Sequence, residues 1–138
     1  GMDSRPTGSE IADATIKTLA ANNVDVNFIG ITAAPEIMAY SKNFDGFIYI
    51  SASHNPIGHN GIKFGLNTGG VLNGTENAKL VQKFNELCDK EDAVDYAMSI
   101  LNKANPSAVE NIYSIIIYRV IQMQMTLMRI ICMKLLLM

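Results

Sequence analysis

The chain has 138 residues, of which 49% are hydrophobic and 17% are charged. These values are typical of a single globular domain. The net charge of −2 argues against nucleic acid as a partner held by bulk electrostatics. Cys88 and Cys132 are far apart and lack metal-ligand spacing, so we expect reduced thiols in a cytoplasmic protein.

Charge is distributed unevenly along the chain. Residues 1–110 carry all thirteen acidic residues and a net charge of −5, whereas the last 28 residues carry +3. A shift of this size predicts a boundary. We therefore expect one domain over residues 1–110 and an apolar helical tail over residues 111–138.

The predicted elements alternate between helices and strands. Ser9 is a plausible helix N-cap, and Ala12, Ile16 and Leu19 follow at helical spacing. In chain order, we expect a helix over 9–22, a strand over 24–29, a helix over 35–42, and strands over 46–51 and 62–66. A turn at 67–70 follows. Two further helices are expected, one capped by Thr75 and Glu76 with Val81, Phe84 and Cys88 on one face, and one over 93–103.

This order predicts an α/β fold, a three-layer α/β/α sandwich with a mostly parallel sheet. In such sheets, ligands bind beyond the carboxyl ends of the strands. The loops after the strands at 24–29 and 46–51 lie at that edge. The fold class alone therefore predicts a site in residues 51–60.

The side chains of this loop suit phosphoryl chemistry. Ser53 is followed by His54, and Lys63 and Arg5 are expected nearby. A hydroxyl close to cationic groups and backbone N–H groups is what a phosphoryl carrier needs. The hydrolase pattern G-x-S-x-G and the nucleotide pattern G-x-x-x-x-G-K-[ST] are both absent. The spacing of His54 and His59 is also poor for zinc, and His59 is expected to be a solvated loop residue.

Three segments resemble one enzyme family. Residues 51–56, SASHNP, with NGIK at 60–63, closely resemble the active-serine loop of the α-D-phosphohexomutase superfamily, the phosphoglucomutase/phosphomannomutase enzymes. Residues 1–8 resemble that family's G-R-D-x-R-x-[ST]-G segment, and residues 30–36 its G-x-x-x-T-P segment. The segments occur in the family's order, and the resemblance covers roughly residues 1–118, as domain I of that family.

The resemblance implies a phosphoserine enzyme that interconverts hexose 1-phosphate and 6-phosphate. In this family, the serine that matches Ser53 donates a phosphoryl group, and a bisphosphate intermediate reorients before one phosphate returns. One Mg²⁺ ion binds the phosphoserine oxygen and three aspartates of a D-G-D-x-D loop. Ser53 would thus reach the metal through its phosphate only, and a hexose phosphate would be the substrate.

Roles for the other matching residues follow from the same resemblance. His54 and Lys63 would act as general acid and base or would orient phosphate. Asp3 is expected to anchor the opening loop through backbone N–H groups. Turn formation is the alternative for the two asparagines. The candidate phosphate contacts are Arg5, Asn55 and Asn60.

Departures from the family pattern imply a fragment. The D-G-D-x-D loop is absent, as are the sugar-reading G-E-x-S-G and the phosphate-binding R-x-S-G-T-E-P segments. Met2 replaces the usual arginine and Ala34 the usual threonine. We therefore expect the missing domains of the same enzyme to be partners of this chain, and the isolated chain to be not fully active.

The C-terminal segment 112–138 is almost wholly apolar and rich in methionine. Arg119 and Arg129 leave nine uncharged positions between them, which argues against a membrane span. The remaining interpretations are a helix that packs on absent parts, an interfacial or partner-binding helix, and the product of a shifted reading frame. The alternatives to a mutase domain are accordingly a non-catalytic sugar-phosphate-binding remnant, or an interaction protein acting through this helix.

Overall fold

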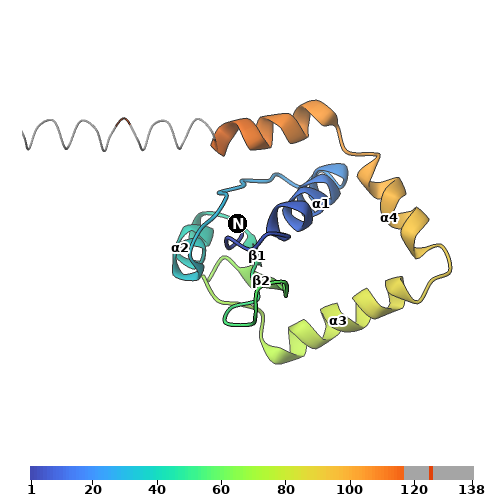
Figure 1. Ribbon diagram of the computed structural model, residues 1–138, viewed down its shortest axis with the longest axis horizontal. Coiled ribbons are helices and arrows are strands. Elements are labelled where there is room, and N and C mark those ends of the chain that lie inside the picture. The colour runs from blue at the N-terminus through green and yellow to red at the C-terminus, as the bar shows by residue number, and fades with distance from the viewer. Residues whose placement is uncertain (117–124, 126–138) are drawn as a thin grey trace, which may run out of the picture.

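The computed structural model describes residues 1–116 and residue 125. A helix over 106–116 follows seven other elements (Figure 1). Those elements are, in order, α1 (Gly8–Ala21), α2 (Ala34–Tyr40), the 3₁₀ turn η1 (Ser41–Asn43), β1 (Gly46–Ile50), β2 (Ile62–Leu66), α3 (Gly74–Cys88) and α4 (Ala93–Leu101).

β1 and β2 pair in an antiparallel register that runs from Gly46 opposite Leu66 to Ile50 opposite Ile62. The strand expected over 62–66 is therefore confirmed, and the one expected over 46–51 ends one residue earlier. The turn expected at 67–70 is also present, because the Gly69 N–H donates to the Leu66 carbonyl at 3.0 Å.

The parallel part of the expected sheet is reduced to two single bridges. Met2 lies between Ile31 and Ile50 and forms a parallel bridge with each of them. The Met2 N–H donates to the Gly30 carbonyl at 3.0 Å, and the Asp3 N–H donates to the Ile50 carbonyl at 2.9 Å. These bonds align the opening residues in parallel with β1. The turn that begins at Ser4 and the loop that begins at Ser51 therefore start at the same edge of the sheet.

The mostly parallel three-layer sandwich is therefore not what the described residues form. Residues 24–29 form no regular strand. The short segment around Met2 bridges Ile31, just beyond them, and turns away at Ser4. A ladder needs an extended partner of several residues. The only regular sheet in residues 1–116 is the antiparallel pair β1–β2.

Helix α1 supports the sheet through a stripe of small and branched residues. Gly8, Ala12 and Ile16 are buried at four-residue spacing, as expected for one face of a helix. The predicted cap at Ser9 is wrong, since the N-cap is Thr7 and its side chain makes no capping hydrogen bond.

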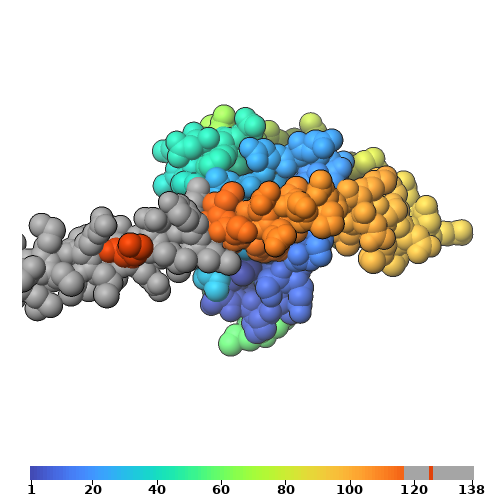
Figure 2. Space-filling model, turned by 90° about the horizontal axis from the view of Figure 1, so that it is seen from above, coloured from blue at the N-terminus to red at the C-terminus, as the bar shows by residue number. Residues whose placement is uncertain are grey.

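The helix 106–116 packs on the core and closes it. The core cluster contains Ala12, Ile16, Phe28, Ile50, Val109 and Ile112. Tyr113 adds an edge-to-face contact with the Phe28 ring at 5.8 Å, and its hydroxyl donates to Asp13 Oδ1 at 3.1 Å. Burial and this carboxylate raise the pKa of Tyr113 to about 12. Figure 2 shows this helix, in orange, lying across the N-terminal part of the chain. The boundary expected between residues 110 and 111 falls inside it.

Helices α3 and α4 lie at the periphery (Figure 1). The N-cap of α3 is Asn73, whose side chain accepts from the Glu76 N–H at 2.9 Å, so the cap predicted at Thr75 is displaced by two residues. No residue of the described helix α3 is buried. The expected face of Val81, Phe84 and Cys88 therefore points to solvent.

The described helices include none that is long and apolar enough to cross a membrane. The expectations for the tail fall mainly on residues 117–138. Of those, all but residue 125 lie outside the described residues.

Candidate functional site

The serine loop, residues 51–61, leaves the carboxyl end of β1 and returns into β2. The Ser51 N–H donates to the Gly61 carbonyl at 2.8 Å and closes the base of the loop. Two inner turns follow, with the Asn55 N–H on the Ala52 carbonyl at 3.1 Å and the His59 N–H on the Pro56 carbonyl at 3.2 Å. The loop is thus a folded structure rather than an open excursion.

Ser53 projects from the first turn of the serine loop. Its φ is +56°, a left-handed conformation that non-glycine residues adopt only where surrounding contacts impose it. Its N–H donates to Ser51 Oγ at 3.1 Å. The side chain is exposed, and its Oγ lies 3.4 Å from His54 Nδ1. An accessible hydroxyl therefore lies close to an imidazole nitrogen, at the long end of hydrogen-bond distance.

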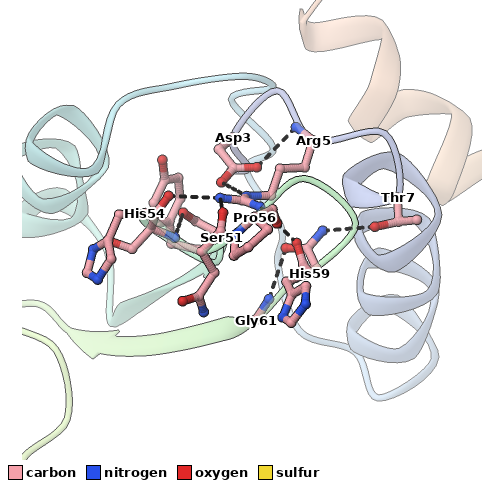
Figure 3. A network of polar contacts seen from close by, with 12 residues as sticks. Asp3, Arg5, Thr7, Ser51, His54, Pro56, His59 and Gly61 are labelled. Atoms are coloured by element: carbon pink, nitrogen blue, oxygen red, sulfur yellow. Dashed lines mark hydrogen bonds and ion pairs between the residues drawn. The ribbon is translucent and has the colours of Figure 1, made fainter.

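Arg5 connects the opening turn to the serine loop (Figure 3). Its Nε donates to Asp3 Oδ2 at 3.1 Å. Its two terminal nitrogens donate, over 2.7 to 3.1 Å, to four backbone carbonyls of the loop. Those carbonyls belong to Ser53, Asn55, Pro56 and His59. In this structure Arg5 thus contacts the loop backbone, and its expected contact with the phosphoserine side stays a prediction.

Asp3 holds the opening turn in the way the sequence predicts. Its Oδ1 accepts from the Arg5 backbone N–H at 3.1 Å, while its Oδ2 pairs with the guanidinium. Burial by itself would raise the pKa of Asp3. Hydrogen bonds from the Ser51 hydroxyl and from Arg5, together with the Arg5 charge, outweigh burial and hold the pKa below its usual value of 3.8.

This shift makes the stability of the domain depend on pH. Because the pKa of Asp3 is lower in the folded state, its contribution is fully present above about pH 3.8 and is lost as the pH falls through the folded value. Asp3→Asn should lower the melting temperature at pH 7, and the difference from the parent should close below pH 3.8. The exposed Asp25, as Asp25→Asn, is the matched control. A difference that stays constant down to pH 3 would contradict this account of Asp3.

Asn60 closes the far side of the serine loop. Its Oδ1 accepts from the Gly61 N–H at 3.0 Å, and its Nδ2 donates to Thr7 Oγ1 at 3.3 Å. This bond connects the Thr7 side chain, at the N-terminus of α1, to the serine loop. The side chain of Asn60 acts here as a turn former that ties the loop to the start of the helix.

Lys63 lies on β2, opposite Tyr49 of β1. Its Nζ is 6.0 Å from the centroid of the Tyr49 ring, at the outer limit of a cation–π contact. The Tyr49 ring is buried and fixed by its hydroxyl, which donates to the Thr32 carbonyl at 2.9 Å. Burial also raises the pKa of Tyr49. The ammonium group therefore lies over a fixed aromatic ring, close to the Ser51–Gly61 base of the serine loop.

Comparison with known proteins identifies this arrangement. A family model described as phosphoglucomutase/phosphomannomutase, alpha/beta/alpha domain I, matches residues 1–91. The chain belongs to the phosphoglucomutase/phosphomannomutase family. The resemblance noted from the three sequence segments is thereby confirmed.

Related mutases match over most of this chain. The phosphoglucosamine mutase of Sulfurovum sp. is 40% identical over 95 residues, which are 67% of this chain and 21% of that protein. That of Aliarcobacter butzleri is 40% identical over 89 residues, 63% of this chain and 20% of that protein. The phosphoglucomutase/phosphomannomutase of Thermococcus kodakarensis is 32% identical over 126 residues, 80% of this chain and 27% of that protein. The chain spans about a fifth to a quarter of the length of these curated relatives.

The residues around the serine loop of this phosphohexomutase domain do not fit a Mg²⁺ site by themselves. Mg²⁺ prefers carboxylate and water oxygens in octahedral geometry. The serine loop contains no acidic residue, and the Asp3 carboxylate is already paired with Arg5. Residues 1–116 and 125 hold no group of three His, Cys, Asp or Glu side chains that could bind a metal ion.

Three site residues were not given these roles by the sequence. Ser51 accepts from the Ser53 N–H, Thr7 accepts from Asn60, and the Asp3 carboxylate pairs with the Arg5 guanidinium. The D-x-R spacing is the one available signal, because it places a carboxylate and a guanidinium within reach of each other in a turn. No such signal exists for Thr7, whose partner Asn60 is 53 residues away, whereas the bond of Ser51 spans only two residues.

Proposed function

We propose that this chain bears the phosphoserine of a phosphohexomutase and that Ser53 takes up and returns the phosphoryl group. The observation that carries the proposal is the exposed Ser53 hydroxyl on a folded loop at the carboxyl end of β1, 3.4 Å from His54 Nδ1. Family membership over residues 1–91 supports it, because the serine loop lies within the matched region.

During the transfer, Ser53 Oγ must regain a proton, and His54 can supply it. A sugar hydroxyl oxygen forms a bond to phosphorus while the bond between phosphorus and Ser53 Oγ breaks. The sugar hydroxyl releases its proton to solvent, and Oγ regains one, so the step consumes no net proton. His54 Nδ1 lies close enough to Oγ to supply that proton once the contact tightens, as catalytic hydrogen bonds commonly do on substrate binding.

Charge compensation is the second requirement. A phosphoserine carries roughly −1.5 to −2 charges at neutral pH, and phosphoryl transfer depends mainly on positioning and on stabilising that charge. Lys63 supplies one fixed positive charge from β2. Asn55 remains a proposed phosphate contact, because it is exposed on the same loop.

The remaining machinery is proposed to come from other domains of the same enzyme. The chain spans about a fifth to a quarter of its relatives and lacks D-G-D-x-D, so the aspartate ligands of Mg²⁺ and the sugar-reading groups would lie there. The relatives are named for mutases of glucosamine, glucose and mannose phosphates. A hexose phosphate in the cytoplasm is the corresponding substrate proposal.

Phosphorylation of Ser53 is tested by intact-mass spectrometry. The chain, incubated with glucose 1,6-bisphosphate and Mg²⁺, should gain the mass of one phosphoryl group. Ser53→Ala should show no gain, because the acceptor oxygen is gone, and Ser9→Ala, at an exposed serine of α1, should behave as the parent.

Two outcomes test the assignment of Ser53 and the dependence of turnover on the other domains. An equal gain in Ser53→Ala and the parent would overturn the assignment of Ser53. Phosphorylation without isomerisation of glucose 1-phosphate is the expected result for the isolated chain, because the missing domains are needed for turnover. Ready isomerisation by this chain alone would contradict that division of labour.

A further inference from the structure

The guanidinium of Arg5 has no free hydrogen-bond donor. A guanidinium carries five N–H groups in a rigid planar fork. Arg5 makes five such bonds, one to Asp3 and four to carbonyls of the serine loop. Its side chain is 12% exposed. An incoming phosphate would therefore have to displace existing partners in order to bind it.

The four carbonyls explain why a cation is needed beneath the loop. The oxygens of Ser53, Asn55, Pro56 and His59 all accept from the two terminal nitrogens of Arg5. Converging carbonyl dipoles repel one another unless a positive group lies between them, and hydrogen bonds to a charged donor are the stronger kind. The loop conformation thus depends on the charge of Arg5 and on the planar arrangement of its donors.

One of these carbonyls belongs to Ser53 itself. The Arg5 Nη2 to Ser53 O distance is 2.9 Å, and Nη2 also reaches the Asn55 carbonyl at 2.7 Å. One bond is at the residue whose φ is +56°, and the other is two residues after it. A left-handed serine persists only when neighbouring contacts over-determine it. Arg5 supplies two of those contacts directly.

We infer that Arg5 is a positioning residue: it fixes the backbone that presents the Ser53 hydroxyl and makes no contact with the transferred phosphoryl group. Asp3 orients Arg5 through the Nε bond and through its hydrogen bond with the Arg5 backbone N–H. The catalytic meaning of this assignment rests on the proposed function, whereas the assignment of Arg5 to the loop backbone does not.

The geometry separates this role from a simple requirement for positive charge. A lysine ammonium has three donors on a single atom and cannot reproduce the fork. If Arg5 served only to attract phosphate, Arg5→Lys would retain most of its effect. If Arg5 organises four carbonyls, Arg5→Lys should fail nearly as completely as Arg5→Ala.

The first test is amide hydrogen exchange in the parent, Arg5→Lys, Arg5→Ala and the control Lys79→Ala, an exposed position on α3. In both Arg5 variants, the amides of Ser53, Asn55 and His59 should exchange about tenfold faster or more. Strand amides of β1 should keep their protection, and Lys79→Ala should match the parent. Parent-like protection of the loop in Arg5→Lys would overturn the inference.

The second test uses nuclear magnetic resonance and needs no variant at Arg5. The guanidinium Nε–H and Nη–H signals should be observable and slowed in rotation in the parent, as expected for a fully bonded guanidinium. They should be unchanged in Ser53→Asp, which places a negative charge where the phosphoryl group is proposed to sit. A shift of the Arg5 signals in Ser53→Asp would show that Arg5 faces that charge and would contradict the inference.

The two proposals fail in different ways. If Ser53 accepts no phosphoryl group from glucose 1,6-bisphosphate, while the loop amides still lose protection in Arg5→Lys, the proposed function fails and the role of Arg5 stands. If Ser53 is phosphorylated equally fast in the parent and in Arg5→Lys, with unchanged loop exchange, the role of Arg5 fails instead.

Discussion

Ile50→Ala should destabilise the domain by about 2–5 kcal/mol, the range for removing a buried branched side chain from a packed core. Ile50 is 3% exposed and belongs to the core cluster with Ala12, Ile16 and Phe28. Its backbone also accepts from the Asp3 N–H at 2.9 Å. Small domains are stable by about 5–15 kcal/mol, so this loss is a large part of the total.

The effect should extend to the serine loop, because Ile50 is the last residue of β1 before it. The matched control is Ile62→Ala on β2, directly opposite Ile50 in the register and 46% exposed. It should change the free energy of unfolding by roughly 0.5 kcal/mol or less. Urea unfolding followed by circular dichroism measures both variants. Equal losses in the two would mean that the Ile50 side chain is not more deeply buried than that of Ile62.

Ile112→Ala should destabilise the protein by a similar amount, about 2–5 kcal/mol. Ile112 is 9% exposed and lies in the core cluster beside Val109. Both residues come from helix 106–116, beyond the region matched by the family model, which ends at residue 91. The prediction therefore tests whether this helix is an integral part of the domain.

Ile115 on the same helix provides the control, since its side chain is 42% exposed. Ile115→Ala makes the same replacement in the same helix and removes the same atoms. It should change the free energy of unfolding by roughly 0.5 kcal/mol or less. A melting temperature of Ile112→Ala that equals that of Ile115→Ala would indicate that helix 106–116 does not cover the core in solution.

Much of the local structure could be predicted, because local signals decide it. The stripe of Ala12 and Ile16 specifies one face of α1, and Pro35 fits the first turn of α2. β2 was predicted with its observed limits, since Gly61 and the turn after Leu66 mark both of its ends. The serine loop was located from its composition and from its position after a buried strand.

The sheet could not be predicted in the same way, because pairing depends on neighbours. Local propensity favours a strand over residues 24–29, but in the described structure the brief parallel segment around Met2 bridges Ile31, just beyond them. β1 instead pairs with the segment that follows it, which a short connection readily allows only for antiparallel strands. Local propensity indicated strands, and the available partners determined which of them formed.

The role of Arg5 was hidden for a different reason. A sequence displays the charge of a side chain but not the backbone carbonyls that will converge on it. Arg5 meets acceptors 48 to 54 residues further along the chain. The sequence accordingly suggested an anion as its partner, whereas in the folded chain its donors are all directed to the loop and to Asp3.

The central claim is that the oxygen of Ser53 holds a phosphoryl group and hands it over. The most direct measurement is a pulse and chase: the chain is labelled with ³²P from glucose 1,6-bisphosphate, the labelled peptide is mapped, and the chain is then incubated with glucose 6-phosphate. The account predicts that the label maps to Ser53 and passes to the sugar phosphate during the chase, in a single slow round that does not sustain ready isomerisation without the missing domains. Label on another residue, or label on Ser53 that glucose 6-phosphate cannot remove, would contradict it.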